Sequence, residues 1–250
     1  MAKLSFANVT VQYPVYNSRG KSLRNQLVRI STGGLIEQES ARVQIVTALK
    51  DVSFDLQHGD KVGLLGHNGS GKSTMLRTMA GIYTPVSGSI VREGRVATVL
   101  ELGAGMDSEL SGYENITRMA MLLGLSLNEI KRKTRDIEEF TQLGDFLNLP
   151  VRTYSAGMAT RLMFAIATST EPDILLVDEV FGAGDAEFQE KAKSRMEALI
   201  SSVGIFAFAS HDLEALKRYC RRFFRLEHGS VVEVSLDEIP KVENINQVVI

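Results

Sequence analysis

One stretch of sequence decides the fold: Gly66-His67-Asn68-Gly69-Ser70-Gly71-Lys72-Ser73. Two glycines with four residues between them, followed by lysine and serine, form the pattern of a phosphate-binding loop. Glycine lets the backbone turn so that successive N–H groups point at phosphate oxygens. An apolar run at 61–65 precedes the loop and a helical pattern at about 72–80 follows it. This context favours a phosphate site over a plain glycine-rich turn, because the helix N-terminus adds the positive end of its dipole.

The polar residues at the end of this loop each have a predicted role toward a nucleotide. Lys72 is expected to reach the β- and γ-phosphates, and the hydroxyl of Ser73 to ligate Mg²⁺. Thr74 follows them and is expected to bond the α-phosphate. The predicted ligands are therefore ATP and Mg²⁺, with residues 66–74 together forming the phosphate part of the site.

A second apolar run, residues 174–177, ends in Asp178 and Glu179. A buried strand seldom ends in two carboxylates without a use for them. Asp178 is expected to hold Mg²⁺, and Glu179 to orient the attacking water as the catalytic base. Alone, such a pair is equally typical of a solvated strand end. The phosphate-binding loop upstream favours the catalytic interpretation.

One of the four histidines, His211, follows a third apolar run at 205–209. A histidine at such a place is more often structural. Beside a γ-phosphate it would instead act as a hydrogen-bonding sensor of that group. The residues themselves leave both interpretations open.

The order of patterns along the chain predicts an α/β domain with a helical insertion. Residues 4–11 and 49–56 alternate at period two, as half-buried strands do, and 223–234 contain a closing hairpin around His228-Gly229. Apolar positions recur at helical spacing through about 110–170, which predicts a helical subdomain. Residues 17–44 are polar and basic and are expected to form a short helix and loop inserted between two strands. The whole chain, 1–250, is expected to be one domain of this kind.

Composition restricts the class of protein. The chain has 250 residues, 44% of them hydrophobic, and a net charge of −2, which argues against a general nucleic-acid binder. A single cysteine, Cys220, rules out an intramolecular disulfide and fits a reducing compartment. No apolar run approaches the ~20 residues that span a bilayer, and no signal peptide is evident. Action at a membrane would therefore require a membrane-embedded partner.

Between the loop and the acidic strand lies a segment that makes the prediction more specific: Tyr154-Ser155-Ala156-Gly157-Met158-Ala159-Thr160-Arg161-Leu162. Taken alone it is a helix start capped by Ser155. In this order and spacing it resembles the signature motif of the ABC ATPase family, commonly Leu-Ser-Gly-Gly-Gln. The resemblance covers nearly the whole chain. It implies an α/β P-loop NTPase fold, an ABC ATPase core with an antiparallel β subdomain and an inserted α-helical subdomain.

The resemblance also implies roles for residues that spacing alone does not assign. Ser155 and Gly157 are expected to contact the γ-phosphate bound to an opposite subunit, so the protein would act as a homodimer. His211 occupies the place of the family's switch histidine, and residues 183–185 that of its D-loop. Tyr13 falls where the family stacks an aromatic on adenine, with Tyr16 as the alternative and an ordinary strand residue as the competing interpretation.

The family usually has a metal-sensing glutamine near residue 101, and this chain has Glu101 instead. Glu101 is predicted either as an acidic replacement in the metal site or as a salt-bridged loop residue. The surrounding Leu-Glu-Leu-Gly-Ala-Gly stretch, the Tyr-Ser-Ala-Gly-Met signature and the 17–44 insertion resemble the polysaccharide-export branch, of the O-antigen type.

That branch implies a transmembrane permease subunit as partner, a lipid-linked glycan as cargo, and a location at the cytoplasmic face of the inner membrane. Three alternatives stay open. A P-loop kinase would not need the segment 154–162 or a glutamate beside Asp178. A non-transport ABC ATPase usually carries a coiled-coil insert or two cassettes. An ABC importer or drug exporter would share the ATPase but carry another cargo.

Overall fold

The computed structural model describes residues 1–15, 44–99, 105–178 and 186–238. Its strands are β1 (Lys3–Val15), β2 (Gln44–Gln57), β3 (Lys61–Leu65), β4 (Ser87–Glu93), β5 (Val96–Val99), β6 (Ile174–Asp178), β7 (Ile205–Ala209), β8 (Arg222–Glu227) and β9 (Ser230–Val234). Its α-helices are α2 (Lys72–Met79), α3 (Gly112–Leu122), α4 (Leu127–Thr141), α5 (Ala156–Ala167), α6 (Ala186–Ser202) and α7 (Leu213–Tyr219). Short 3-10 turns lie at Gly144–Asn148, Val151–Thr153 and Leu236–Glu238.

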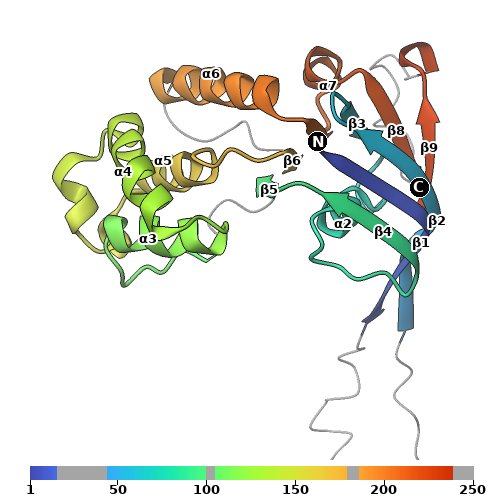
Figure 1. Ribbon diagram of the computed structural model, residues 1–250, viewed down its shortest axis with the longest axis horizontal. Helices are drawn as coiled ribbons and strands as arrows, with labels where there is room; N and C mark the ends of the chain where they lie inside the picture. The colour runs from blue at the N-terminus through green and yellow to red at the C-terminus, as the bar shows by residue number, and fades with distance from the viewer. Residues whose placement is uncertain (16–43, 100–104, 179–185, 239–250) are drawn as a thin grey trace, which may run out of the picture.

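Two sheets form one part of the molecule (Figure 1). Strands β2, β1 and β4 make an antiparallel sheet, and the second sheet has the order β5-β6-β7-β3-β8-β9. All its neighbouring pairs are parallel except β8 and β9, which form the antiparallel hairpin expected at the C-terminal side. The fold class predicted from the sequence, a parallel sheet with an antiparallel sheet beside it, is confirmed.

The strands β6 and β7 of this sheet are buried on both faces, which explains their uninterrupted apolar sequences. All five residues of β7 are buried, as are the first four of β6. Helix α2 and the antiparallel sheet contribute to the core on one face, through side chains such as Met75 and Leu76. Helices α6 and α7 contribute to a second core on the other, through Met196 and Leu216.

Helices α3, α4 and α5 lie together at one end of the molecule, and Phe164 of α5 also packs in the core beside β5 and β6 (Figure 1). They enclose a third core that includes Ile116, Ile137 and Leu162, one from each helix. Both α3 and α4 begin with a capping box, in which a serine and a glutamate three residues later bond each other's backbone N–H. The helical region expected at about 110–170 is therefore present.

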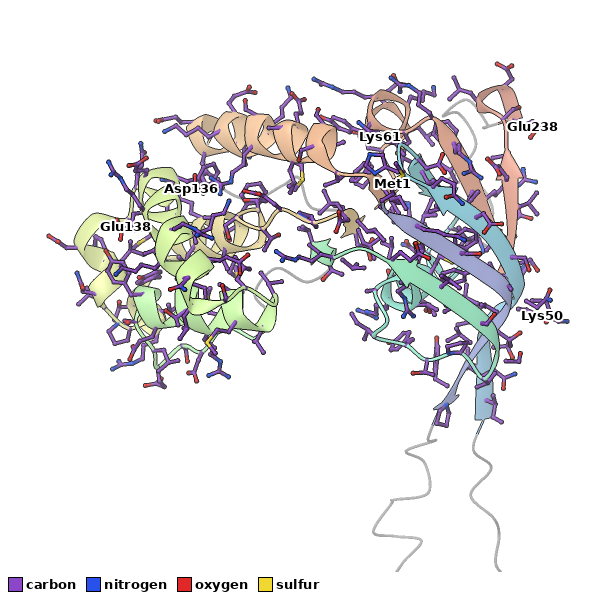
Figure 2. All side chains as sticks on the ribbon, in the orientation of Figure 1. Met1, Lys50, Lys61, Asp136, Glu138 and Glu238 are labelled. Atoms are coloured by element: carbon purple, nitrogen blue, oxygen red, sulfur yellow. The ribbon has the colours of Figure 1, made fainter. Side chains whose placement is uncertain are left out.

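This helical group contacts α6 through an aromatic and ionic cluster. The rings of Phe140, Phe164 and Phe188 lie within 6.0 Å of one another, centroid to centroid. Arg195 of α6 lies 4.5 Å from the centre of the Phe140 ring and pairs with Asp136 of α4, which is labelled in Figure 2. The cluster fixes α4 and α5 against a helix of the sheet domain.

Some predicted features fall outside the described residues: the insertion at 17–44 up to the start of β2, Tyr16, Glu101, Glu179 and the stretch 183–185. Across the helices that the structure does describe, none has both the length and the apolar character needed to cross a bilayer.

Candidate functional site

The candidate site lies where the parallel strands end. The glycine-rich loop follows β3, Asp178 is the last residue of β6, and His211 comes two residues after β7. Since these strands are parallel neighbours, their carboxyl ends share one edge of the sheet, the usual place for ligands in such folds. A pocket of about 640 Å³ opens there, lined by Tyr13, Val46, Thr47, Ala48, Asn68, Gly69, Gly71, Lys72, Ser73, Thr74, Asp178, His211, His228 and Gly229.

The loop has a shape that only glycine permits at two places. Gly66 has φ 153°, and a Cβ there would lie 2.4 Å from Ser70 Oγ and 2.7 Å from the Leu226 carbonyl oxygen. Gly71 has φ 109°, and a Cβ would lie 2.9 Å from the Ala48 carbonyl oxygen. Helix α2 begins directly after Gly71 without a side-chain cap. Its first N–H groups are therefore available to an anion.

Lys72 is buried and lines the pocket, with its side chain turned back toward the loop. Its Nζ donates to the carbonyl oxygens of Gly66, at 2.7 Å, and His67, at 3.2 Å. A buried ammonium is held by such bonds until an anion offers stronger ones. Lys72 is thus placed for the phosphate contact predicted from the sequence.

Ser70 Oγ is the one buried side-chain oxygen or nitrogen that lacks a hydrogen-bond partner among the described residues. An unpartnered buried hydroxyl costs about 1–3 kcal/mol, so native proteins seldom keep one without a ligand or water to satisfy it. This oxygen lies inside the loop, where a Cβ on Gly66 would meet it at 2.4 Å. The loop residues Gly66, His67 and Ser70 do not line the pocket but support those that do.

The pocket also offers oxygen donors suited to a hard divalent cation. The Ser73 hydroxyl and the Asp178 carboxylate come from different elements and line the same pocket. Mg²⁺ is bound in proteins by one or two such groups together with phosphate oxygens and water. These residues therefore fit the metal predicted from the sequence, while Glu101 lies outside the described part of the chain.

His211 is brought to the pocket that Asp178 lines, which favours the sensor interpretation over a purely structural histidine. The chain around it is held on both sides. Ser210 Oγ accepts a hydrogen bond from the Asp212 N–H, at 3.0 Å, and Asp212 caps α7 by accepting from Glu214 N–H and Ala215 N–H. The imidazole therefore projects from a fixed backbone.

Tyr13 also lines the pocket, as does Val46, its partner in the β1–β2 pairing. Its side chain is 41% exposed, so the aromatic ring is accessible for stacking on a flat ligand. This arrangement favours Tyr13 in the choice that the sequence left open, while Tyr16 lies outside the described residues.

Ser155 and Gly157 begin α5 in the helical group and do not line this pocket. Ser155 is exposed and caps the helix, with its Oγ accepting from the Met158 N–H at 3.2 Å. The residue before it is anchored: Tyr154 OH donates to the Phe146 carbonyl oxygen at 2.7 Å, and burial raises the pKa of this phenol. The signature segment thus presents a fixed hydroxyl and free helix N–H groups away from its own chain's pocket.

Several residues at the site were not predicted from the sequence. Val46, Thr47 and Ala48 line the pocket from β2, and His228 and Gly229 line it from the β8–β9 turn. The turn itself was expected, but its position depends on β8 pairing with β3, which no local pattern shows. Strand β2 likewise reaches the site through its pairing with β1.

Comparisons with known proteins agree with this geometry. Residues 49–182 match the family model of ABC transporters. The O-antigen export system ATP-binding protein RfbE of Yersinia enterocolitica is 63% identical over 95% of this chain and 99% of its own length. The teichoic acids export ATP-binding protein TagH of Listeria monocytogenes is 35% identical over 93% of this chain and 66% of its own length. Among solved structures, an ATP binding subunit of an ABC transporter shares 26% identity with a TM-score of 0.67, covering 94% of this chain and 90% of that one.

Proposed function

This chain belongs to the ABC transporter family, and from that premise we propose that it is the ATP-hydrolysing subunit of a transporter that exports a lipid-linked polysaccharide of the O-antigen class. The observation that carries the proposal is the pocket at the sheet edge, where the glycine-rich loop, Asp178, His211 and Tyr13 meet. The export class rests on the 63% identity to an O-antigen export subunit along nearly the whole chain.

The phosphates of ATP would lie in the loop, bound by its N–H groups and by Lys72. Ser73 and Asp178 would hold Mg²⁺, which supplies positive charge to the phosphate oxygens when bound. Thr74 would bond the α-phosphate, and Tyr13 would stack on the adenine ring. The remaining loop residues, from Gly66 to Gly71, shape the cradle.

Hydrolysis requires a water aligned with the γ-phosphate. Glu179 follows Asp178 in sequence, and the proposal assigns it the role of orienting and polarising that water. His211 would donate a hydrogen bond to the γ-phosphate from the end of β7. Positioning and electrostatics provide most of the rate enhancement in this kind of phosphoryl transfer, so few residues need to take part covalently.

The second half of the site would come from another copy of the chain. Ser155 is exposed at the N-terminus of α5, outside its own chain's pocket. In a head-to-tail homodimer the Ser155 hydroxyl and the N–H of Gly157 would face the γ-phosphate of the partner. ATP would then favour the closed dimer through contacts that exist only in that state.

The closed and open dimers would drive a transmembrane permease at the cytoplasmic face of the inner membrane. Residues 1–250 would form one nucleotide-binding domain, with the helical subdomain at about 110–170 and the insertion at about 17–44. Nucleic acid would not be a partner of this protein. Transport of another cargo remains the second candidate, and the cargo is what the next experiment tests.

The test replaces the chromosomal copy by Glu179→Gln and measures surface polysaccharide together with lipid-linked glycan inside the cell. Loss at the surface with accumulation inside is expected. The matched control is Glu187→Gln, since Glu187 lies exposed on α6, outside the pocket, and forms an ion pair with Lys191. Normal surface glycan without internal accumulation would exclude this cargo and make transport of another substrate the leading candidate.

A further inference from the structure

The hairpin between β8 and β9 contains a histidine in an unusual backbone conformation. Glu227 pairs with Ser230, so the turn has only two residues, His228 and Gly229. Their φ angles are +48° and +81°. Positive φ at both central residues defines a type I′ turn, which favours Asn-Gly, Asp-Gly or Gly-Gly.

Histidine is therefore not the residue that this turn would select for its own sake. A side chain kept against the local preference of the backbone, next to a binding pocket, indicates a use beyond the turn. Here the pocket is adjacent, because both His228 and Gly229 line it.

The turn is held firmly against the nucleotide site. The Lys50 N–H, at the position labelled in Figure 2, donates to the Gly229 carbonyl oxygen at 2.9 Å. A Cβ on Gly229 would lie 3.0 Å from the Ala48 carbonyl oxygen, and one on Gly66 would lie 2.7 Å from that of Leu226. The backbone carrying His228 thus packs against both β2 and the phosphate-binding loop, with no space between them.

The His228 ring has polar groups to offer. Its centroid lies 5.9 Å from that of His67, whose Nδ1 already bonds the Asn68 carbonyl oxygen at 2.7 Å. The side chain of His228 is exposed, and within the described part of the chain no recorded hydrogen bond or ion pair engages its ring nitrogens. An imidazole always has at least one N–H to donate and an aromatic face.

The position of His228 within the pocket indicates which part of a nucleotide it would meet. The phosphate end is marked by Lys72, Ser73 and Asp178. The turn instead packs on Ala48, the neighbour of Thr47 and Val46, and these β2 residues line the pocket with Tyr13. Ala48 also contacts the loop, since a Cβ on Gly71 would lie 2.9 Å from its carbonyl oxygen. His228 thus lies where the loop meets these β2 residues, between the phosphate end and Tyr13, which is where the sugar that joins the phosphates to the base would lie.

We propose that His228 is a nucleotide-binding residue that contacts the nucleoside part of ATP, donating a hydrogen bond to the ribose or the purine. The inference rests on the proposed nucleotide site and adds a contact from the C-terminal hairpin. The C-terminal hairpin would then contact the ligand through one of its two turn residues.

The test uses His228→Asn, which suits the turn better and removes the ring. Calorimetric titration of the purified chain with ATP and with ADP is expected to show about five-fold weaker binding of both, the size of one net hydrogen bond. Inorganic triphosphate should bind equally to both proteins. The thermal midpoint without nucleotide should be unchanged or higher, since asparagine relieves the turn.

Two variants make the outcome decisive. His58→Asn changes a histidine of another His-Gly turn that does not line the pocket, and its ATP affinity should equal that of the unmodified chain. Lys72→Ala should lose ATP binding; if it does not, the proposed nucleotide site itself fails. If Lys72→Ala loses binding while His228→Asn binds ATP normally, only the inference about His228 is overturned. An equal loss of inorganic triphosphate binding would also overturn it, because the contact would then be to phosphate.

Discussion

The Asn115→Ala substitution should show how strongly one buried amide organises the helical part of the molecule. Asn115 lies on α3 and has no exposed surface. Its Oδ1 accepts from the Asp107 N–H at 2.8 Å. The two hydrogens of its Nδ2 are shared among three carbonyl oxygens, those of Asp107, Leu110 and Ser111, at 2.9 to 3.2 Å.

Alanine at this position would remove all of these side-chain bonds. The three carbonyl oxygens keep backbone donors, the N–H groups of Leu110, Val151 and residue 115 itself, so of these groups only the Asp107 N–H is left without a partner. Each net hydrogen bond contributes about 1 kcal/mol, and a group left buried without a partner costs about 1–3 kcal/mol. Alanine is the better helix former by about 0.6 kcal/mol, and water entering the space would satisfy part of the loss. The expected decrease in the free energy of unfolding is therefore about 3 kcal/mol.

The Asn115→Ala substitution should also disturb the position of the signature segment, residues 154–162. The loop organised by Asn115 accepts hydrogen bonds from the Val151 and Arg152 N–H groups, through the carbonyls of Leu110 and Ser108. Arg152 lies two residues before Tyr154 and three before Ser155. We expect ATP turnover to fall further than ATP affinity, since the phosphate-binding loop lies in the other part of the molecule.

Urea unfolding of the nucleotide-free chain, followed by circular dichroism, measures the loss, with the slope against urea checked for a change in the unfolded state. Asn128→Ala is the matched control, because Asn128 is exposed in the first turn of α4. A value for Asn115→Ala within about 0.5 kcal/mol of the unmodified chain, the range of ordinary surface substitutions, would refute the reasoning.

The remaining predictions concern single side chains. Burial raises the pKa of the Cys220 thiol to about 12, so maleimide should label it at pH 8 only as fast as the chain unfolds; rapid labelling of the native protein would contradict this. Hydrogen bonds from Arg222 lower the pKa of Glu233, so this pair stabilises the fold above the ordinary glutamate pKa of about 4.3 and the contribution is lost as the pH falls below it. Glu233→Gln should therefore flatten the acid side of the stability–pH curve, and parallel curves for the two proteins would argue against it.

Much of the fold could be predicted because its patterns are local. The run 205–209 is apolar without interruption because β7 is covered on both faces, and β3 was predicted with the bounds that it has. The loop 66–73 and the acidic end of β6 specify their chemistry through residue type and spacing. For these elements, the residue types and their spacing were enough to predict the strand and the loop that follows it.

The rest of the site depends on pairings between distant segments. No local pattern predicts that the Asn115 side chain is buried and hydrogen-bonded, and only the return of 107–111 onto its amide shows this structural role. His228 was recognised as part of a turn, but the pairing of β8 with β3 is what places it at the pocket. Such placements arise from the tertiary fold and have no periodic signal.

The central claim is that one chain binds ATP while the signature of a second chain completes the site. ATP-induced dimerisation of the Glu179→Gln chain, measured by light scattering with and without Ser155→Asp, tests it most directly. Aspartate caps α5 as well as serine does, but it would place a negative charge opposite the partner's γ-phosphate. We expect the double variant to bind ATP with unchanged affinity and to remain monomeric. ATP-dependent dimers of normal stability, or an equal loss of ATP binding by the single chain, would contradict the account.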